Sequence, residues 1–288
     1  MGARPAHDLT KGESHTMGEL KVDPKDVPVV ILCGGMGTRL REASEKLPKP
    51  LVEIGGRPIV WHIMKTYGHY GFRKFVLALG YKSDLIKDYF LNFRLLTSDF
   101  RLQLSGDHNL EYLSASHEED WEITFAETGL KTATATRLLR VDDYLGDAEH
   151  FAITYGDGVG AVDLAASFAA HLDKDVLGSV TGVHPTSRYG EMNVTGDMVG
   201  EFNEKPTRPE GWVNGGYFFF QREFVKKYCS GDPDEMLEHA PLQHLARDGG
   251  LSVYEHNGFW MGMDTYRDWV ELNSLWDSGQ AEWKVWND

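Results

Sequence analysis

Apolar and polar positions follow two alternating patterns through the first half of the chain. Mainly apolar runs at 29–33, 74–79 and 151–155, each followed by a glycine, predict buried strands. Between the first two runs, apolar residues recur at helical spacing over 58–70, and Pro58 stands where proline favours the start of a helix. Strands that alternate with helices predict a parallel sheet wound with helices, the Rossmann-like α/β class.

Weaker patterns fill the rest of this half. Ser83 with Asp84 is expected to cap a helix that runs to about residue 95, and a second helix is expected over 132–145. Alternating polar and apolar residues predict strands at 100–104 and 122–127. The polar segment between these strands, about 105–120, is expected to be a mobile loop.

After about residue 175 the pattern changes to short strands joined by turns. Strands are expected at 177–184, 191–195, 198–202 and 215–221, and a final helix is expected over 264–276. We therefore expect a mixed, mainly parallel sheet flanked by helices, with a smaller β-rich lobe built from the later strands.

Composition limits the classes of protein to which the chain could belong. Its 288 residues are enough for one large α/β domain, or for one domain with a ligand-binding insertion. No apolar run reaches the length of a membrane span, and residues 1–27 lack the apolar region of a secretory signal. We expect residues 1–27 to be a disordered extension or an expression leader. The net charge of −15 argues against nucleic acid or an anionic membrane as a partner.

The chain has only two cysteines, Cys33 and Cys229. They are too few and too far apart for a disulfide framework or a zinc site. The reducing cytoplasm is the compartment that fits this cysteine usage, so we expect a cytoplasmic protein.

The segment GGMGTR at 34–39 directly follows the first predicted strand. Its three glycines let backbone N–H groups approach a phosphate closely, and amides oriented in this way form an anion-binding nest. Arg39 and Lys49 add the positive charge that a triphosphate requires. The segment lacks the P-loop spacing, and Leu40 stands where the dinucleotide fingerprint requires glycine or alanine. The sequence therefore predicts a nucleotide site of another kind.

Further motifs follow this segment in a characteristic order, and together they resemble the sugar-nucleotidyltransferase family over about residues 28–288. They are PKPLVEIGGRPI at 48–59, YGDG at 155–158, EKP at 204–206, NGG at 214–216 and MDT at 263–265. Within the family, the resemblance is to the cytidylyltransferases that act on glucose 1-phosphate. IVWHIM at 59–64, YGDGV at 155–159 and the tryptophan-rich tail from 258 to 286 carry this narrower resemblance.

The resemblance implies a reaction of two polyanions, in which CTP and α-D-glucose 1-phosphate give CDP-glucose and pyrophosphate. The sugar-phosphate oxygen that attacks the α-phosphorus is already anionic, so the site must suppress charge repulsion and does not need a general base. The resemblance implies Arg39, Lys49, Asp157 and Lys205 as catalytic residues, and Asp157 with Asp264 as the ligands of Mg²⁺. From its local pattern alone, Asp157 is a turn former just past a predicted strand.

Two larger groups of residues are implied as ligand contacts. The expected nucleotide contacts are Leu32, Gly34, Gly35, Met36, Gly37, Thr38, Arg39, Lys49, Gly80, Tyr81, Thr128, Gly129 and Thr134. The expected sugar-phosphate contacts are Tyr155, Gly156, Arg188, Tyr189, Gly190, Glu204, Lys205, Asn214, Gly215 and Gly216. The implied division of the chain is a nucleotide-binding core at 28–175, a sugar-phosphate-binding lobe at 176–262, and a C-terminal helix and tail at 263–288.

Three alternatives stay open at this point. Residues 134–137 read TATR where the cytidylyltransferases have TGGR, which leaves dTTP or UTP, or another sugar 1-phosphate, as substrates of the same chemistry. A nucleotide-sugar-sensing regulatory subunit is a second alternative, although such a protein would be free to lose some of the charged site residues. A nicotinamide-dependent oxidoreductase is the third, and Leu40 counts against it.

Aromatic residues crowd the last thirty positions of the chain. Such density is typical of packing or of a subunit contact, so Trp283 and Trp286 are predicted to serve one of these purposes. His62, on the apolar face of a predicted helix, is predicted to be a core histidine with satisfied hydrogen bonds. The family resemblance also implies a homo-oligomer.

Overall fold

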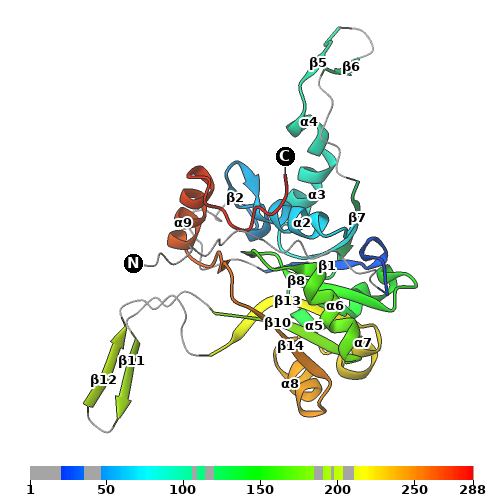
Figure 1. Cartoon of the computed structure of the whole chain (residues 1–288). Coiled ribbons are helices and arrows are strands. Elements are labelled where there is room, and N and C mark those ends of the chain that lie inside the picture. The colour runs from blue at the N-terminus through cyan, green and yellow to red at the C-terminus, as the bar shows by residue number, and fades with distance from the viewer. Residues whose placement is uncertain are drawn as a thin grey trace, which may run out of the picture.

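A central sheet organises the molecule (Figure 1). The computed structural model describes residues 21–35, 47–105, 109–113, 120–184, 191–195, 198–203 and 211–287, with side chains omitted over 191–203. Within this part of the chain, seven strands form one sheet in the order β14 (Leu251–His256), β10 (Gly178–Val183), β13 (Val213–Gln221), β8 (His150–Tyr155), β1 (Val29–Cys33), β4 (Lys74–Leu79) and β7 (Glu122–Glu127). Neighbours are parallel except that β13 runs antiparallel to β8 and β10. The predicted mixed, mainly parallel α/β class is confirmed.

The sheet carries a core on each face, and β1 shows why. All five of its residues are buried. Because successive side chains of a strand point to opposite faces, Val29, Ile31 and Cys33 belong to one core cluster, whereas Val30 and Leu32 belong to the other. A strand that is buried on both faces needs a continuous apolar run, which is the pattern that the sequence shows.

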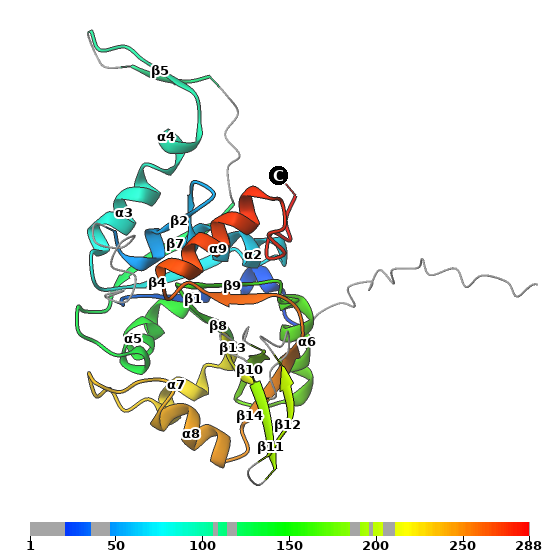
Figure 2. The same cartoon turned by 90° about the vertical axis from the view of Figure 1, so that its left-hand side faces the viewer.

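Helices cover both faces of the sheet (Figure 2). The first core cluster includes residues of α2 (Ile59–His69), α3 (Ser83–Leu91), α6 (Leu164–Lys174) and α9 (Tyr266–Asp277). The second includes residues of α5 (Thr134–Val141), α7 (Glu223–Tyr228) and α8 (Ala240–Arg247). The short 3-10 turns η2 (Lys49–Leu51) and η3 (Asp142–Leu145) and the pair β2 (Glu53–Ile54) and β3 (Arg57–Pro58) complete the connections around these layers. No helix of the described residues is long and apolar enough to cross a membrane.

The segment around 83–113 differs from the expectation. The helix expected over 83–95 is interrupted at Asn92, whose side-chain amide donates to the carbonyl oxygen of Asp88 (2.9 Å), and α4 (Phe93–Thr97) follows. The loop expected over 105–120 contains a strand, β6 (Leu110–Tyr112), which pairs with β5 (Phe100–Leu102). This hairpin extends away from the body of the molecule (Figures 1 and 2). β6 has only three residues, so it lacks the longer apolar run that marks the strands of the central sheet.

The strands after residue 175 do not form a lobe with one sheet of its own. β10, β13 and β14 belong to the central sheet, while β11 (Glu191–Thr195) and β12 (Met198–Asn203) pair with each other. The reason lies in β13, where Tyr217, Phe218, Phe219 and Phe220 are all buried, so that both faces of this strand require covering helices. The division between nucleotide-binding and sugar-binding parts therefore stays a prediction about ligands and does not separate two sheets.

Part of the expected N-terminal extension is packed on the core. Val27 is only 1% exposed and belongs to the first core cluster, and Pro24 begins the 3-10 turn η1 (Pro24–Asp26). The Asp23 side chain accepts a hydrogen bond from the backbone N–H of Lys25 (3.0 Å). Residues 21–27 therefore belong to the folded body, whereas residues 1–20 lie outside the described part of the chain.

The C-terminal tail packs on α2, which confirms a packing role for its aromatic residues. Trp283 and Trp286 are buried in the first core cluster, and both rings lie beside the imidazole of His62. The Nε2 atom of His62 lies 2.8 Å from the Ile54 carbonyl oxygen, so it donates, and Nδ1 accepts from the indole N–H of Trp283 (3.4 Å). His62 is thus the satisfied core histidine that the sequence predicted.

Burial lowers the pKa of His62 from 6.5 to about 4. Between these pH values His62 is protonated in the unfolded chain but neutral in the folded chain. The free energy of unfolding therefore decreases as the pH falls from about 6.5 to 4. The loss is on the order of 3 kcal/mol. We expect His62→Gln to be less stable at pH 7.5 but to lose less of its unfolding free energy on acidification.

Urea unfolding at pH 7.5 and pH 5 would measure the effect, with His244→Gln, at an exposed position of α8, as the matched control. An acid-induced loss of the same size in His62→Gln and in the unaltered chain would contradict this account.

Candidate active site

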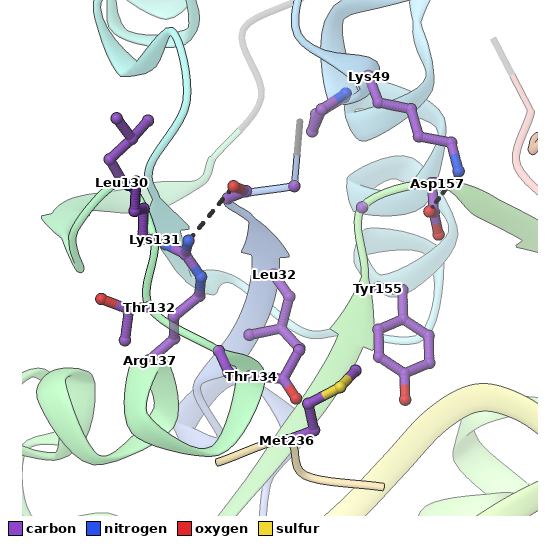
Figure 3. Close-up of a pocket in the computed structure, with 15 residues that line it drawn as sticks. Leu32, Lys49, Leu130, Lys131, Thr132, Thr134, Arg137, Tyr155, Asp157 and Met236 are labelled. Carbon is purple, nitrogen blue, oxygen red and sulfur yellow. Dashed lines mark hydrogen bonds and ion pairs between the residues drawn. The ribbon is translucent and has the colours of Figure 1, made fainter. Parts of the chain in front are cut away.

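A cavity of about 370 Å³ lies at the carboxyl ends of β1 and β8 (Figure 3). Ligands of open α/β sheets bind at this edge, because the chain leaves adjacent strands there in diverging loops. The residues that line the cavity are Leu32, Gly34, Gly35, Lys49, Pro50, Leu130, Lys131, Thr132, Ala133, Thr134, Arg137, Tyr155, Gly156, Asp157 and Met236. We call it the first cavity.

A second cavity of about 250 Å³ adjoins the first. Its lining residues are Thr154, Tyr155, Asp157, Gly158, Asn214, Gly215, Gly216, Tyr217, Trp260, Gly262 and Asp264. Tyr155 and Asp157 line both cavities, so these two side chains form the wall between them. Two adjoining cavities with a shared acidic wall can hold two ligands side by side.

Lys49, Asp157 and Asp264 meet at the junction of the cavities. The Lys49 Nζ atom lies 2.6 Å from Asp157 Oδ2 and 2.7 Å from Asp264 Oδ1. Lys49 begins η2, whereas Asp157 follows β8 and Asp264 follows β15 (Trp260–Gly262). Figure 3 shows the Lys49 side chain reaching towards Asp157. Three charged residues that are far apart along the chain thus form one cluster.

Local structure holds the two aspartates in place. β9 (Gly158–Gly160) pairs antiparallel with β15, and the Met263 N–H donates to the Asp157 carbonyl oxygen (2.8 Å). The Asp268 carboxylate caps α9 and accepts from the backbone N–H groups of Asp264 (3.1 Å) and Thr265 (2.8 Å). Pairing on one side and a capping box on the other therefore fix the backbone from which Asp264 projects.

The charges of this cluster favour a bound cation. Burial opposes the charged form of Lys49, but the adjacent Asp157 and Asp264 carboxylates outweigh burial and raise the pKa of its ammonium above the ordinary value. The ammonium occupies the point on which both carboxylates converge. Mg²⁺ binds through one or two carboxylates together with substrate phosphates, so this pair of carboxylates is of the kind that could hold it. No group of three or more acidic, histidine or cysteine side chains around a metal position occurs among the described residues.

Arg137 brings a second, buried cation to the first cavity. Its side chain, on α5, donates to the Leu79 carbonyl oxygen (2.9 Å), to Thr128 Oγ1 (2.6 Å) and to the Gly34 carbonyl oxygen (3.3 Å). These acceptors are neutral, and burial lowers the pKa of the guanidinium. In Figure 3, Arg137 and Lys49 lie on opposite sides of Leu32. Together with Lys131, which also lines the first cavity, these residues give it three positive charges, and a polyanionic ligand requires such charges.

Arg137 also changes the explanation of one glycine. A Cβ atom on Gly34 would lie 2.0 Å from the guanidinium carbon of Arg137, so glycine is needed there to make room for the arginine. Among the described residues, a Cβ on Gly35 would meet nothing within 4 Å. Gly35 is thus the position at which a ligand could approach the backbone.

The expected nucleotide contacts divide into two groups. Leu32, Gly34, Gly35, Lys49 and Thr134 line the first cavity. Gly80, Tyr81, Thr128 and Gly129 do not line it. The Thr128 hydroxyl is fully buried, where it donates to the Leu79 carbonyl oxygen (2.6 Å) and accepts from Arg137. Thr128 therefore helps to orient the Arg137 side chain.

The expected sugar-phosphate contacts also divide. Tyr155, Asn214, Gly215 and Gly216 line the second cavity, whereas Gly156 lines the first. The remaining expected site residues lie outside the described part of the chain: Met36, Gly37, Thr38, Arg39, Arg188, Tyr189, Gly190, Glu204 and Lys205.

The TATR segment places its methyl groups away from the first cavity. Ala135 is fully buried in the second core cluster, and the Thr136 hydroxyl donates to the Asp232 carbonyl oxygen. Thr134 and Arg137, one helical turn apart, are the two members of this segment that line the cavity. The replacement of the two glycines of TGGR therefore leaves the cavity wall unobstructed by side chains.

Sequence reasoning did not identify Arg137 or Glu238 as site residues. Arg137 could have been identified from its spacing, because it lies three positions after Thr134 and therefore on the same face of the helix. Glu238 carried no such signal, since it lies in an irregular segment before α8, yet its carboxylate accepts from both Thr134 and Tyr155. Trp260 lines the second cavity and donates its indole N–H to the Gly215 carbonyl oxygen (2.7 Å).

Comparisons with known proteins agree with this geometry. Residues 28–279 match the family model described as nucleotidyl transferase. A probable glucose-1-phosphate cytidylyltransferase of Bacillus subtilis is 44% identical over 257 residues, which cover 89% of this chain and 99% of the relative. The glucose-1-phosphate cytidylyltransferase of Salmonella typhimurium is 40% identical over 258 residues, 89% of this chain and 98% of the relative.

A solved structure shares the fold. A putative glucose-1-phosphate thymidylyltransferase from Bacillus anthracis superimposes with a TM-score of 0.64 at 16% identity, over 91% of this chain and 98% of that one. The sheet, the two adjoining cavities at its carboxyl edge and the sequence match all lead to the same assignment: the chain belongs to the nucleotidyl transferase family, and within it is similar to the glucose-1-phosphate cytidylyltransferases.

Proposed function

We propose that the chain condenses CTP with α-D-glucose 1-phosphate to give CDP-glucose and pyrophosphate. The observation that carries this proposal is the junction of two cavities at Lys49, Asp157 and Asp264. The first cavity would hold the nucleotide and the second the sugar phosphate. The 40–44% identity to glucose-1-phosphate cytidylyltransferases supports this choice of substrates.

The chain's own residues would act by charge and by position. The attacking oxygen of the sugar phosphate is already anionic, so the site needs no base and must instead offset the repulsion between two phosphates. Lys49 and Arg137, on opposite sides of the first cavity, would neutralise the triphosphate. Asp157 and Asp264 would hold Mg²⁺, which when bound supplies further positive charge at the reacting phosphates. Arg39 and Lys205 are proposed as additional phosphate ligands.

The wall shared by the two cavities would align the reactants. In-line displacement requires the attacking oxygen, the α-phosphorus and the leaving pyrophosphate to be collinear, and fixed neighbouring sites provide such alignment. Tyr155, Asn214, Gly215 and Gly216 would contact the sugar. The backbone around Gly35 and the side chain of Thr134 would contact the nucleotide.

Pyrophosphate release with each nucleoside triphosphate in turn tests the proposal. We expect CTP to exceed UTP and dTTP by about 10- to 100-fold in kcat/KM, because uracil and thymine exchange the donor of cytosine for an acceptor and leave a site group unpaired. Equal turnover with UTP or dTTP would overturn the cytidine assignment and keep the chemistry. Nucleotide-sugar binding without turnover of any triphosphate would instead favour a regulatory subunit.

The same proposal includes the assembly and location of the protein. We propose a homo-oligomer, because the arm formed by residues 91–105 and 109–113 exposes several leucines, with Leu91 81% and Leu104 73% exposed. A pair of short strands is barely stable alone in water, so contact with a second copy would stabilise it. Light scattering that gives a monomer at micromolar concentration would refute this assembly. Free Cys33 and Cys229 are compatible with the cytoplasm as the location.

A further inference from the structure

Glu238 bonds to side chains that line the two cavities. One carboxylate oxygen, Oε2, accepts from the Thr134 hydroxyl (3.0 Å), and the other, Oε1, accepts from the Tyr155 hydroxyl. Thr134 lines the first cavity, and Tyr155 lines both. Glu238 itself lines neither cavity, so it reaches a ligand only through the residues that it holds.

A carboxylate can only accept hydrogen bonds, so each residue bonded to it must act as a donor. This in turn fixes the donors and acceptors of the next residues in the network. Tyr155 must donate its single hydrogen to Glu238, so its oxygen can only accept from Asn214 Nδ2 (3.3 Å). The Asn214 amide is thereby oriented with its nitrogen towards Tyr155 and its oxygen towards the Gly216 N–H (2.8 Å). One acidic side chain thus determines which atoms donate and which accept, from the first cavity to the second.

Packing keeps this arrangement in one state. The Tyr155 hydroxyl is bonded on both sides, to Glu238 and to Asn214. The Tyr155 ring also packs closely on Gly216, whose φ is +79°, and a Cβ there would lie 2.5 Å from the ring. Neither the ring nor the loop can therefore shift without disturbing the other.

The hydrogen-bonding groups that remain in this network indicate how the second cavity could recognise a sugar. Within the described part of the chain, Asn214 Nδ2 donates to Tyr155 alone, which leaves its second hydrogen for a ligand in the second cavity, while its oxygen accepts from the Gly216 N–H. The cavity wall therefore offers a donor there, which suits a sugar hydroxyl oxygen as acceptor. On the other side, the Thr134 oxygen accepts from the Leu237 N–H (2.7 Å), which fixes its hydroxyl towards Glu238.

We propose that Glu238 is a positioning residue that sets the hydrogen-bond polarity of the wall between the nucleotide and sugar-phosphate cavities. It thereby determines how Asn214 recognises the sugar. This inference rests on the proposed function for the identity of the two ligands. Replacement by glutamine keeps the size of Glu238 but introduces a donor, so one of its two hydroxyl partners must reverse or lose its bond.

The test is a double-mutant cycle with Glu238→Gln and Tyr155→Phe, in the full chain. We expect Glu238→Gln to raise the KM for glucose 1-phosphate by about 10-fold with a smaller change in kcat, because binding geometry is affected more than the charged residues. Tyr155→Phe should have a similar effect, and the double variant should be no worse than either single variant. Additive effects, or a normal KM in Glu238→Gln, would overturn the role of Glu238.

Controls separate positioning from general stability. Glu235→Gln alters a nearby glutamate that accepts from the Ser230 N–H (2.8 Å) outside both cavities, and it should leave both KM values unchanged. Asn214→Asp places an acceptor against an oxygen that cannot donate, so it should raise the KM for the sugar phosphate and spare that for CTP. This exposed position keeps the test decisive if Glu238→Gln folds poorly.

Failure of the proposed function would look different. An unaltered chain that releases no pyrophosphate with any triphosphate would refute the cytidylyltransferase assignment. Calorimetric titration of CTP and of glucose 1-phosphate into the same variants would then still measure the coupling through Glu238. Unaltered turnover and unaltered titration curves in Glu238→Gln would refute the positioning role alone.

Discussion

Asp157→Asn is expected to lower turnover by about 10²- to 10³-fold while the protein stays folded. The amide keeps the shape of the carboxylate but removes one of the two negative charges that converge on the junction of the cavities. The proposed metal site would be left with Asp264 alone. Lys49 would also lose the ion pair that its Nζ atom makes with Asp157 Oδ2 at 2.6 Å. Initial rates of pyrophosphate release under saturating substrates would measure the loss.

The fold should tolerate this change. The Asp157 side chain is 38% exposed, and exposed ion pairs contribute about 0–1 kcal/mol to stability. Thermal unfolding should therefore shift by only a few degrees. Asp234→Asn, at an exposed position outside both cavities, is the matched control and should keep full activity. Near-normal turnover in Asp157→Asn would remove this residue from the proposed metal site.

Lys49→Gln is expected to produce two effects of opposite sign. Turnover should fall by about 10²- to 10³-fold, because a buried cation beside the reacting phosphates is lost. Binding of Mn²⁺ in the absence of nucleotide should become tighter, by about 10-fold, because the ammonium no longer competes for the point between Asp157 and Asp264. A residue that only stabilised the fold would not increase metal affinity.

Electron paramagnetic resonance of free Mn²⁺ would measure this affinity without substrates. Lys131→Gln is the matched control, since Lys131 is an exposed lysine that also lines the first cavity. It should leave Mn²⁺ binding unchanged, because its ammonium does not lie between the carboxylates. If Lys49→Gln bound Mn²⁺ no better than the unaltered chain, the competition between lysine and metal would be disproved.

The two variants together test one physical idea. In the free protein the Lys49 ammonium balances the charges of Asp157 and Asp264, and its side chain is only 12% exposed. A triphosphate in the first cavity would attract the ammonium and release both carboxylates for a divalent ion. Nucleotide and metal would then bind as partners, which would explain how an acidic junction could accept two polyanions.

Much of the sheet could be predicted because its signals are local. The apolar runs of β1, β4 and β8 coincide with the expected strands, and the helical spacing of 58–70 locates α2 to within a residue or two. Burial on both faces imposes these patterns directly on neighbouring residues. β5 was also predicted, from the alternation at 100–104, but β6 was missed, because its three residues are largely exposed and are too few to show a pattern.

Site residues followed the same rule. Lys49 and Asp157, which were recognised by motif, lie in short connections of distinctive composition, and Asn214 lies near the start of β13 beside two glycines. Arg137 and Glu238 lie in ordinary surroundings along the chain, and their importance comes from partners on other elements. Glu238 contacts Thr134 and Tyr155 across sequence separations of 104 and 83 residues, which no local pattern reports.

The order of apolar runs and glycine-rich turns was sufficient to establish the α/β class and the kind of ligand. Secondary structure, and the close approach of a ligand to the backbone, both depend on residues that are adjacent in the sequence. Only the tertiary structure placed Lys49 between two carboxylates that lie 108 and 215 positions away, and showed that Arg137 requires the glycine at position 34. Electrostatic contacts form through space, so their partners are chosen by strand order and pairing: β8 beside β1, and β15 beside β9.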